Sequence, residues 1–137
     1  MIGILLISHG DMAKGMISSA SMLYPDIAQV DALGLMPQDN PDDFQVELEK
    51  KVAELDTGQG VYILCDLMGG TPGNRAAYVI GDKVRLLAGM SLPMLLALLF
   101  AREGTDDFDE ITETVLLETR NATVDVYAIF KEKGIIK

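Results

Sequence analysis

The sequence is poor in the residues that build covalently linked or metal-linked structures. It contains one cysteine, Cys65, and one histidine, His9, among 137 residues. A single cysteine forms no internal disulfide, and no zinc-binding spacing of cysteine and histidine is present, so we expect no metal site. Cys65 lies within an apolar run, which is typical of a small buried hydrophobic residue. A lone thiol also suits a reducing compartment.

Basic residues are scarce relative to acidic ones. The chain has 11 lysines and arginines against 21 aspartates and glutamates, which gives a formal net charge of −10. The phosphate backbone of a nucleic acid repels such a surface, so we expect no nucleic-acid partner. The acidic surface favours solubility, and it would also steer a basic protein partner toward the molecule.

Long apolar runs are absent. The most apolar stretch, Leu92–Ala101, is far shorter than the roughly twenty residues that a bilayer span requires. The start of the sequence, MIGILLISHGD, has no basic segment and no small-residue cleavage site, and so does not look like a signal peptide. We therefore predict a cytoplasmic protein that is linked to a membrane only indirectly.

What the sequence does contain is a regular alternation of apolar segments and amphipathic helix patterns. Continuous hydrophobicity favours strands buried on both faces, as in a parallel sheet. Ile2–Ile7 is a continuous apolar run of this kind, and Val61–Cys65 is a further apolar strand. Val30–Leu35 is a weaker second strand, and Val84–Ala88 is a fourth. No repeat or linker interrupts them, so we predict one domain over residues 1–137.

Helices are expected between these strands from residue periodicity and from capping residues. A first helix with apolar positions from Ala13 to Tyr24 is stopped by Pro25. Further helices should begin at Asn40–Pro41, Thr71–Pro72, Ser91 and Thr105–Asp106. The segment Thr123–Phe130 alternates loosely between apolar and polar residues, which predicts a C-terminal edge strand.

This order predicts an α/β fold with an open, mostly parallel, doubly wound sheet and helices on both faces. The expected strand order begins 2-1-3-4. Ligands of such sheets bind at the carboxyl ends of the strands, at the switch point between strands 1 and 3. Strand 1 ends at Ser8-His9-Gly10 and strand 3 ends at Asp66, so we expect His9 and Asp66 to meet there.

A histidine paired with a carboxylate is suited to nucleophilic chemistry. Asp66 would hold one imidazole nitrogen of His9 and leave the other free to attack, and it would stabilise the imidazolium that forms. Gly10 allows the backbone to turn sharply after the histidine. The alternatives are an ordinary loop histidine and a loop carboxylate that caps nearby amides, but the position of both residues favours a site.

A glycine-rich loop follows Asp66. Gly69 and Gly70 allow close approach to a ligand, and Thr71 opens a helix whose first amides lack internal partners. No Lys-Ser/Thr follows the glycines, so this is not a nucleotide-binding P-loop. The alternative is a plain glycine-rich turn before a capped helix. Together with His9 and Asp66, the loop indicates a phosphohistidine site that needs no metal or organic cofactor.

Three stretches, GILLISHGDMAKGM, CDLMGGTPGNRAA and LLAGMSLPMLLALL, resemble the enzyme IIA domain of the mannose-type (mannose/fructose/sorbose) phosphoenolpyruvate-dependent sugar phosphotransferase system. The resemblance covers nearly the whole chain. It implies that Nε2 of His9 accepts a phosphoryl group from phospho-HPr and passes it to a histidine of enzyme IIB, here expected on a separate chain. It also implies that Asp66 holds the other ring nitrogen and that Gly69–Thr71 lies against the phosphoryl group.

The resemblance further implies a homodimer, with the C-terminal strand crossing onto the partner's sheet, and membrane permease components as indirect partners. Family members often carry an aromatic residue at the positions of Met68 and Gly73, some carry tryptophan at Asp11, and a small residue is usual at Arg75. These departures concern partner and sugar recognition. Arg75 either reaches the phosphoryl group or is a solvated helix arginine.

Three other functions are compatible with parts of this pattern. The phosphotransferase subunit of a dihydroxyacetone kinase uses the same kind of histidine but generally lacks the Gly-Gly-Thr-Pro segment. A receiver domain would be phosphorylated on Asp66, but it also needs an acidic pair after strand 1 and a lysine after its last strand. A histidine phosphatase requires an arginine in place of Ser8 and a second histidine, and the sequence has neither.

Overall fold

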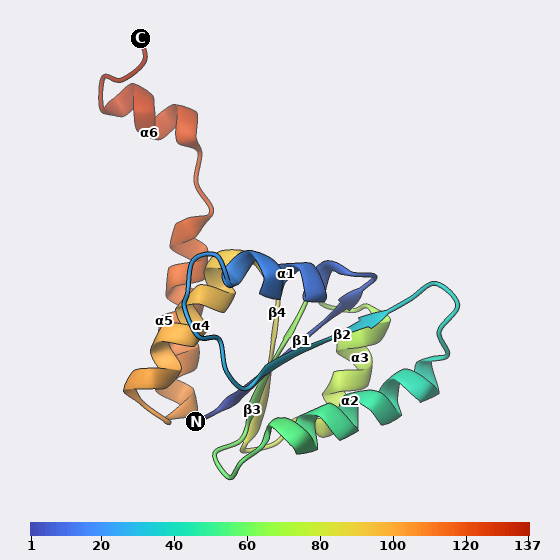
Figure 1. The fold of residues 1–137 in the computed structure, drawn as a ribbon. Coiled ribbons are helices and arrows are strands. Elements are labelled where there is room, and N and C mark those ends of the chain that lie inside the picture. Colours follow the sequence, from blue (N-terminus) through green and yellow to red (C-terminus); the bar gives the residue numbers. More distant parts are fainter.

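A parallel four-stranded sheet forms the centre of the computed structural model, which describes residues 1–137 (Figure 1). Its strands are β1 (Gly3–His9), β2 (Val30–Leu35), β3 (Val61–Cys65) and β4 (Val84–Ala88). They lie in the order β2-β1-β3-β4, and all neighbouring strands are parallel. The predicted α/β class, the four strand segments and the strand order are confirmed.

The two central strands are the most buried, as their continuous apolar sequences predict. Every residue of β3 is buried, as is every residue of β1 except His9 at its end. Ile7 of β1 is level with Cys65 of β3, so the carboxyl ends of the two strands meet at one edge of the sheet. This register brings the residues that follow, His9 and Asp66, to the same place.

Helices cover both faces of the sheet, and the hydrophobic core therefore has two layers, one on each face (Figure 1). One face packs against α1 (Met12–Ala20), α4 (Leu92–Gly104) and α5 (Phe108–Ala122). The other packs against α2 (Pro41–Leu55) and the short α3 (Thr71–Ala76), which continues into a 3₁₀ turn, η1 (Ala77–Val79). The predicted inward stripe of α2 is buried throughout: Phe44, Leu48, Val52 and Leu55.

Helix starts follow the capping residues closely. The Asn40 side chain accepts a hydrogen bond from the amide of Asp42 at 2.7 Å, and the Ser91 hydroxyl accepts one from Met94 at 3.2 Å. The first helix is shorter than predicted, since α1 ends at Ala20 and a turn leads to Pro25. At the start of α3 the capping position is Gly70, not Thr71, and no side chain caps it.

The predicted C-terminal edge strand, Thr123–Phe130, is wrong. Residues Val126–Glu132 form a helix, α6, which projects away from the body of the molecule (Figure 1). The Asp125 carboxylate accepts a hydrogen bond from the Ala128 amide at 3.2 Å and so caps its start. A strand needs a neighbouring strand to pair its backbone groups, whereas a helix pairs them internally, and this projecting segment has no neighbouring strand.

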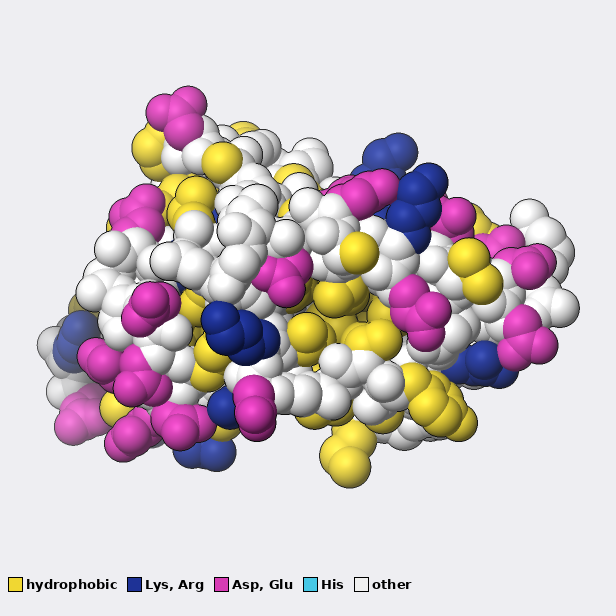
Figure 2. Space-filling model, turned by 90° about the horizontal axis from the view of Figure 1, so that it is seen from below, with side chains coloured by type: hydrophobic (Ala, Val, Ile, Leu, Met, Phe, Trp, Pro, Cys, Tyr) yellow, Lys and Arg dark blue, Asp and Glu magenta, His cyan; other side chains and the backbone are white.

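The surface is acidic over much of its extent. Viewed from below the orientation of Figure 1, aspartate and glutamate side chains spread over the face with lysine and arginine between them (Figure 2). No helix of the protein combines the length and the apolar composition that crossing a membrane requires.

Candidate functional site

His9 and Asp66 form a directly hydrogen-bonded pair at the carboxyl edge of the sheet. Nδ1 of His9 lies 2.7 Å from Oδ2 of Asp66, and the backbone amide of His9 donates to the same oxygen at 2.9 Å. The sequence predicted this meeting from strand order alone. One carboxylate oxygen thus fixes both the main chain and the ring of the histidine.

The two side chains differ in their access to solvent. The His9 side chain is 50% exposed, whereas that of Asp66 is 9% exposed. The second oxygen of Asp66, Oδ1, accepts a hydrogen bond from the Leu67 amide at 2.9 Å. Burial by itself raises the pKa of Asp66, but the hydrogen bonds from His9 and Leu67 outweigh it, so the pKa lies below its ordinary value. Asp66 is therefore an anion at neutral pH.

The charge on Asp66 sets the tautomer of the histidine. An ionised carboxylate only accepts hydrogen bonds, so Nδ1 of His9 carries the proton. The neutral ring then has its lone pair on Nε2, which makes no hydrogen bond within the chain. The arrangement leaves an oriented nucleophilic nitrogen at a half-exposed position.

The glycine-rich loop lies against the free edge of the His9 ring. A Cβ atom built on Gly70 would lie 2.6 Å from Cε1 of His9, which is too close without a shift of the ring or the loop, and 3.3 Å from Nε2. Gly69 has a φ of 91°, a conformation that favours glycine. Gly70 therefore borders Nε2 of His9, and Gly69 and Thr71 are its neighbours in the chain.

The turn that follows His9 is fixed by hydrogen bonds and close contacts to β1, β2 and α1. Gly10 has a φ of 59°, and its amide donates to the Leu35 carbonyl at 2.8 Å. Two residues that hold this turn were missed by the sequence analysis. Ser8 bonds to both the turn and α1, and Gly34 of β2 lies so close to the Gly10 carbonyl that a Cβ atom would overlap it. A glycine inside an apolar strand was the available signal for Gly34.

Arg75 does not belong to the site. Its guanidinium donates to the Asp42 carboxylate of α2 at 2.9 Å, so this arginine forms an ion pair between two helices. Cys65 is buried as predicted, and burial raises the pKa of its thiol. Its sulfur lies against Gly73, which leaves no room for a larger residue there without adjustment.

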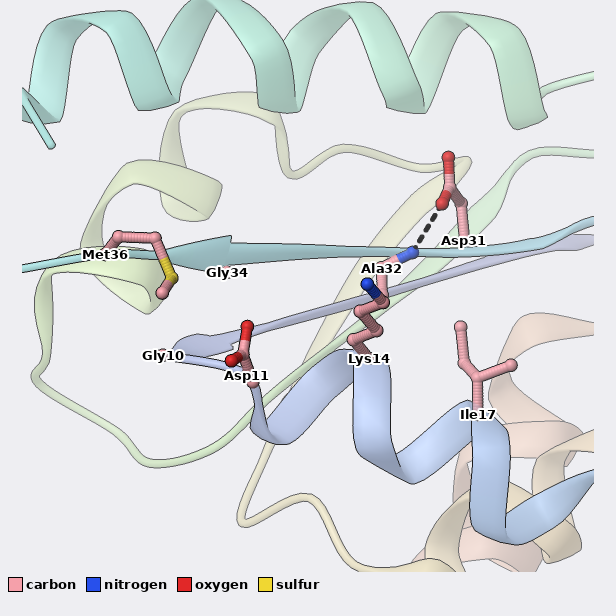
Figure 3. Close-up of a pocket in the computed structure, with 8 residues that line it drawn as sticks. All are labelled: Gly10, Asp11, Lys14, Ile17, Asp31, Ala32, Gly34 and Met36. Atoms are coloured by element: carbon pink, nitrogen blue, oxygen red, sulfur yellow. Dashed lines mark hydrogen bonds between the residues drawn. The ribbon is translucent and has the colours of Figure 1, made fainter.

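A cavity of about 330 Å³ lies beside the site, between the start of α1 and β2 (Figure 3). Figure 3 shows Asp11 next to Gly10, and Lys14 one turn further along α1 on the side that faces β2. The Asp31 carboxylate in its wall is already paired, with Lys51 at 2.6 Å and the Ala32 amide at 2.7 Å.

Neither His9 nor Asp66 lines this cavity or any other in the molecule. A nucleophile at His9 would therefore act at an open surface, which suits a reaction partner that is itself a protein better than an enclosed small molecule. No group of three histidine, cysteine, aspartate or glutamate side chains is arranged to hold a metal ion.

Comparison with known proteins gives a consistent result. Residues 3–116 match the family model described as "PTS system fructose IIA component". The mannose-specific EIIAB component of Escherichia coli K12 is 33% identical over 112 residues, which is 80% of this chain but only 35% of that protein. The chain thus spans about a third of the length of this curated relative.

Relatives of similar length also match. The sorbose-specific EIIA component of Klebsiella pneumoniae is 33% identical over 100 residues, which cover 72% of this chain and 73% of that protein. Among solved structures, the phosphotransferase system component EIIA of Streptococcus agalactiae superimposes with a TM-score of 0.85 at 25% identity, and covers 93% of this chain and 99% of that chain.

Proposed function

The chain belongs to the PTS fructose IIA component family, and from this premise we propose that it is a phosphocarrier that takes a phosphoryl group on Nε2 of His9 and passes it on. The observation that carries the proposal is the orientation of the histidine. Asp66 occupies Nδ1 of this half-exposed side chain, which leaves Nε2 free beside Gly70. This is the nitrogen that an incoming phosphoryl group meets.

Transfer to His9 is an in-line displacement at phosphorus. The lone pair of Nε2 forms the new N–P bond while the N–P bond of the donor's phosphohistidine breaks, and the donor ring keeps that electron pair. As the His9 ring becomes cationic, its Nδ1–H stays on the Asp66 carboxylate, whose negative charge lies next to the developing positive charge. Transfer onward is the same step in reverse, with His9 as the leaving group.

The glycine loop would stabilise the phosphoryl oxygens. Gly69 and Gly70 carry no side chain, and Thr71 carries a hydroxyl that can donate a hydrogen bond. The first amides of α3 have no partner within the helix and are free to donate to oxygen. Backbone donors that are already in place stabilise charge without reorganising during the reaction.

The partners we propose are phospho-HPr as donor and a histidine of an enzyme IIB component as acceptor. A nucleophile on an open surface needs donor and acceptor groups that are themselves presented by proteins, and the net charge of −10 favours partners with a basic docking face. Enzyme IIB would in turn serve sugar-transporting permease components in the membrane. We propose a cytoplasmic location on these grounds.

We also propose a homodimer. α6 has no buried residue, and it exposes Val126, Tyr127 and Phe130. Apolar side chains gathered on one short projecting helix are costly to leave in water, and a second copy of the chain would cover them. Sedimentation of the intact protein should give a dimer mass, and Tyr127→Glu with Phe130→Glu should give a monomer. A monomer at all concentrations in the unchanged protein contradicts this part of the proposal.

The deciding experiment is phosphorylation with phosphoenolpyruvate, enzyme I and HPr, followed by intact mass measurement. We expect one added phosphoryl group that is labile to acid and absent from His9→Ala. No addition, with HPr itself phosphorylated, would refute the proposal. An acid-stable addition on Asp66 would instead indicate a receiver domain, and transfer to a nucleotide-loaded kinase subunit would indicate a dihydroxyacetone kinase component.

A further inference from the structure

Ser8, directly before His9, is a fully buried polar side chain. Its exposed fraction is 0%, and Arg102 is the one other polar or charged residue that is buried. A hydroxyl that is fully withdrawn from water needs hydrogen-bond partners, because an unpaired buried polar group is costly. The partners of Ser8 lie in the turn that presents His9.

The Ser8 hydroxyl joins strand, turn and helix. It accepts a hydrogen bond from the Ala13 amide at 2.8 Å and donates one to the Gly10 carbonyl at 3.2 Å. Asp11 occupies the capping position of α1 but its side chain makes no capping bond. Ser8 therefore satisfies one of the free amides at the start of α1 that the capping residue leaves open.

With this bond, both the amide and the carbonyl of Gly10 are hydrogen-bonded. The Gly10 amide donates to Leu35 and the Gly10 carbonyl accepts from Ser8. Gly10 has a φ of 59°, a left-handed conformation that is only one of several a glycine can adopt, so hydrogen bonds are needed to fix it. Without the Ser8 hydroxyl, the carbonyl side of the turn has no anchor to β1.

Movement of the turn is transmitted to the histidine ring. The main-chain amide and the ring of His9 share Oδ2 of Asp66, so a shift of the main chain at residue 9 lengthens or bends both bonds. The ring orientation, and with it the direction of the Nε2 lone pair, depends on the main chain that Ser8 helps to fix.

We infer that Ser8 is a positioning residue, whose hydroxyl holds the turn so that His9 Nδ1 stays on Asp66 and Nε2 faces the reaction partner. The kinetic consequence rests on the proposed phosphocarrier function. The consequence for the ring itself does not, because the His9–Asp66 hydrogen bond exists without any partner.

The kinetic test compares Ser8→Ala, Ser8→Thr and Ser19→Ala. Ser8→Ala should lower kcat for transfer by about ten- to a hundredfold, as expected for a misplaced reacting group, and leave KM unchanged. Ser8→Thr keeps the hydroxyl and should restore most of the rate. Ser19 is exposed on α1, so Ser19→Ala is the matched control and should behave as the unchanged protein.

The second readout is the tautomer of the His9 ring, which is measured from the ¹⁵N NMR chemical shifts of its two nitrogens. The unchanged protein and Ser8→Thr should show the Nδ1–H tautomer, and Ser8→Ala should show a mixture of both tautomers. Thermal unfolding establishes which variants are folded. If Ser8→Ala is not, Ser8→Cys, with a similar size and only a weak hydrogen-bonding group, should give the same mixture.

The inference is overturned if Ser8→Ala keeps both the rate and the tautomer of the unchanged protein. It is also overturned if the rate falls while the tautomer stays unchanged and Ser8→Thr gives no rescue, since Ser8 would then serve stability alone. If the unchanged protein accepts no phosphoryl group, the proposed function fails, and the tautomer comparison still decides the role of Ser8.

Discussion

One oxygen atom, Oδ2 of Asp66, determines the chemical state of His9. It accepts from both the amide and Nδ1 of the histidine, so it fixes the tautomer as well as the ring position. An amide in place of the carboxylate could present its NH₂ group to Nδ1 and favour the other tautomer. The charge and the acceptor-only character of the carboxylate are therefore both required.

For Asp66→Asn we expect a folded protein whose transfer rate is lower by about a hundredfold or more, since both tautomer control and the stabilising charge are lost. Transfer rates from phospho-HPr measure this, and circular dichroism checks the fold. A variant with the rate of the unchanged protein would remove Asp66 from the mechanism.

The hydrogen bond between His9 and Asp66 should make the free energy of unfolding depend on pH. The pKa of Asp66 is lowered in the folded state, so its contribution is fully present above the unfolded aspartate pKa of about 3.9 and is lost as pH falls through the folded value. The difference in unfolding free energy between the unchanged protein and Asp66→Asn should shrink below about pH 4. Denaturant unfolding across that range measures it, and a constant difference would contradict the assignment.

Gly70→Ala should block the site sterically. Its methyl group would overlap Cε1 of His9, and the ring or the loop would have to move. We expect transfer to fall sharply. Gly15→Ala is the matched control, because a Cβ atom there meets nothing within 4 Å and the residue lies inside α1. That control should keep full activity and gain up to about 1 kcal/mol of stability.

Among the helices and strands, β1 and β3 bring His9 and Asp66 together at their carboxyl ends, and a core on each face of the sheet packs against these strands. α4 illustrates how an element contributes stability without touching the site. It starts directly after Ser91, whose hydroxyl caps it, and it buries Met94, Leu95 and Leu98 in the core. A change at its cap should affect folding and not chemistry.

Ser91→Ala should lower the free energy of unfolding by about 1 kcal/mol, the usual cost of a lost helix cap. Transfer kinetics should be unchanged at temperatures where the variant is folded. Urea unfolding measures the first quantity. A loss of transfer without a loss of stability would show that α4 has a part in the site.

Across the whole molecule, the exposed nucleophile and the acidic surface imply that a protein docks over the site during transfer. Met68 stands on the loop beside His9 and is 88% exposed, while Met22 is 86% exposed on the turn after α1. The two methionine side chains are nearly equally exposed, but only Met68 lies near His9. Substituting each of them therefore tests whether partner docking depends on the surface beside His9.

Met68→Lys should raise KM for phospho-HPr several-fold, because it places a positive charge against the basic docking face of the partner, and Met22→Lys should not. The rate at saturating donor should change little in either variant, since neither residue touches the reacting atoms. Equal effects of the two substitutions would place the docking surface elsewhere. Raised salt should also increase KM, because it screens the acidic surface.

The sequence alone predicted the strand segments, their order and the meeting of His9 and Asp66. Apolar runs such as Val61–Cys65 require burial on both faces, and chain-connection rules then bring the ends of strands 1 and 3 together. Asn40 and Ser91 marked helix starts because capping is a local interaction. The motifs around His9 and Asp66 pointed to the family that the comparisons then matched.

Only the tertiary structure decided the rest. The state of Thr123–Phe130 depends on whether another strand lies within reach, which local alternation does not reveal, and here residues 126–130 lie in the helix α6. Arg75 found its partner on α2, and Ser8 and Gly34 acquired their roles from contacts with a turn and a neighbouring strand. Some of these contacts join residues that are distant in the sequence, and others depend on the conformation of one turn. Both kinds exist only in the folded protein.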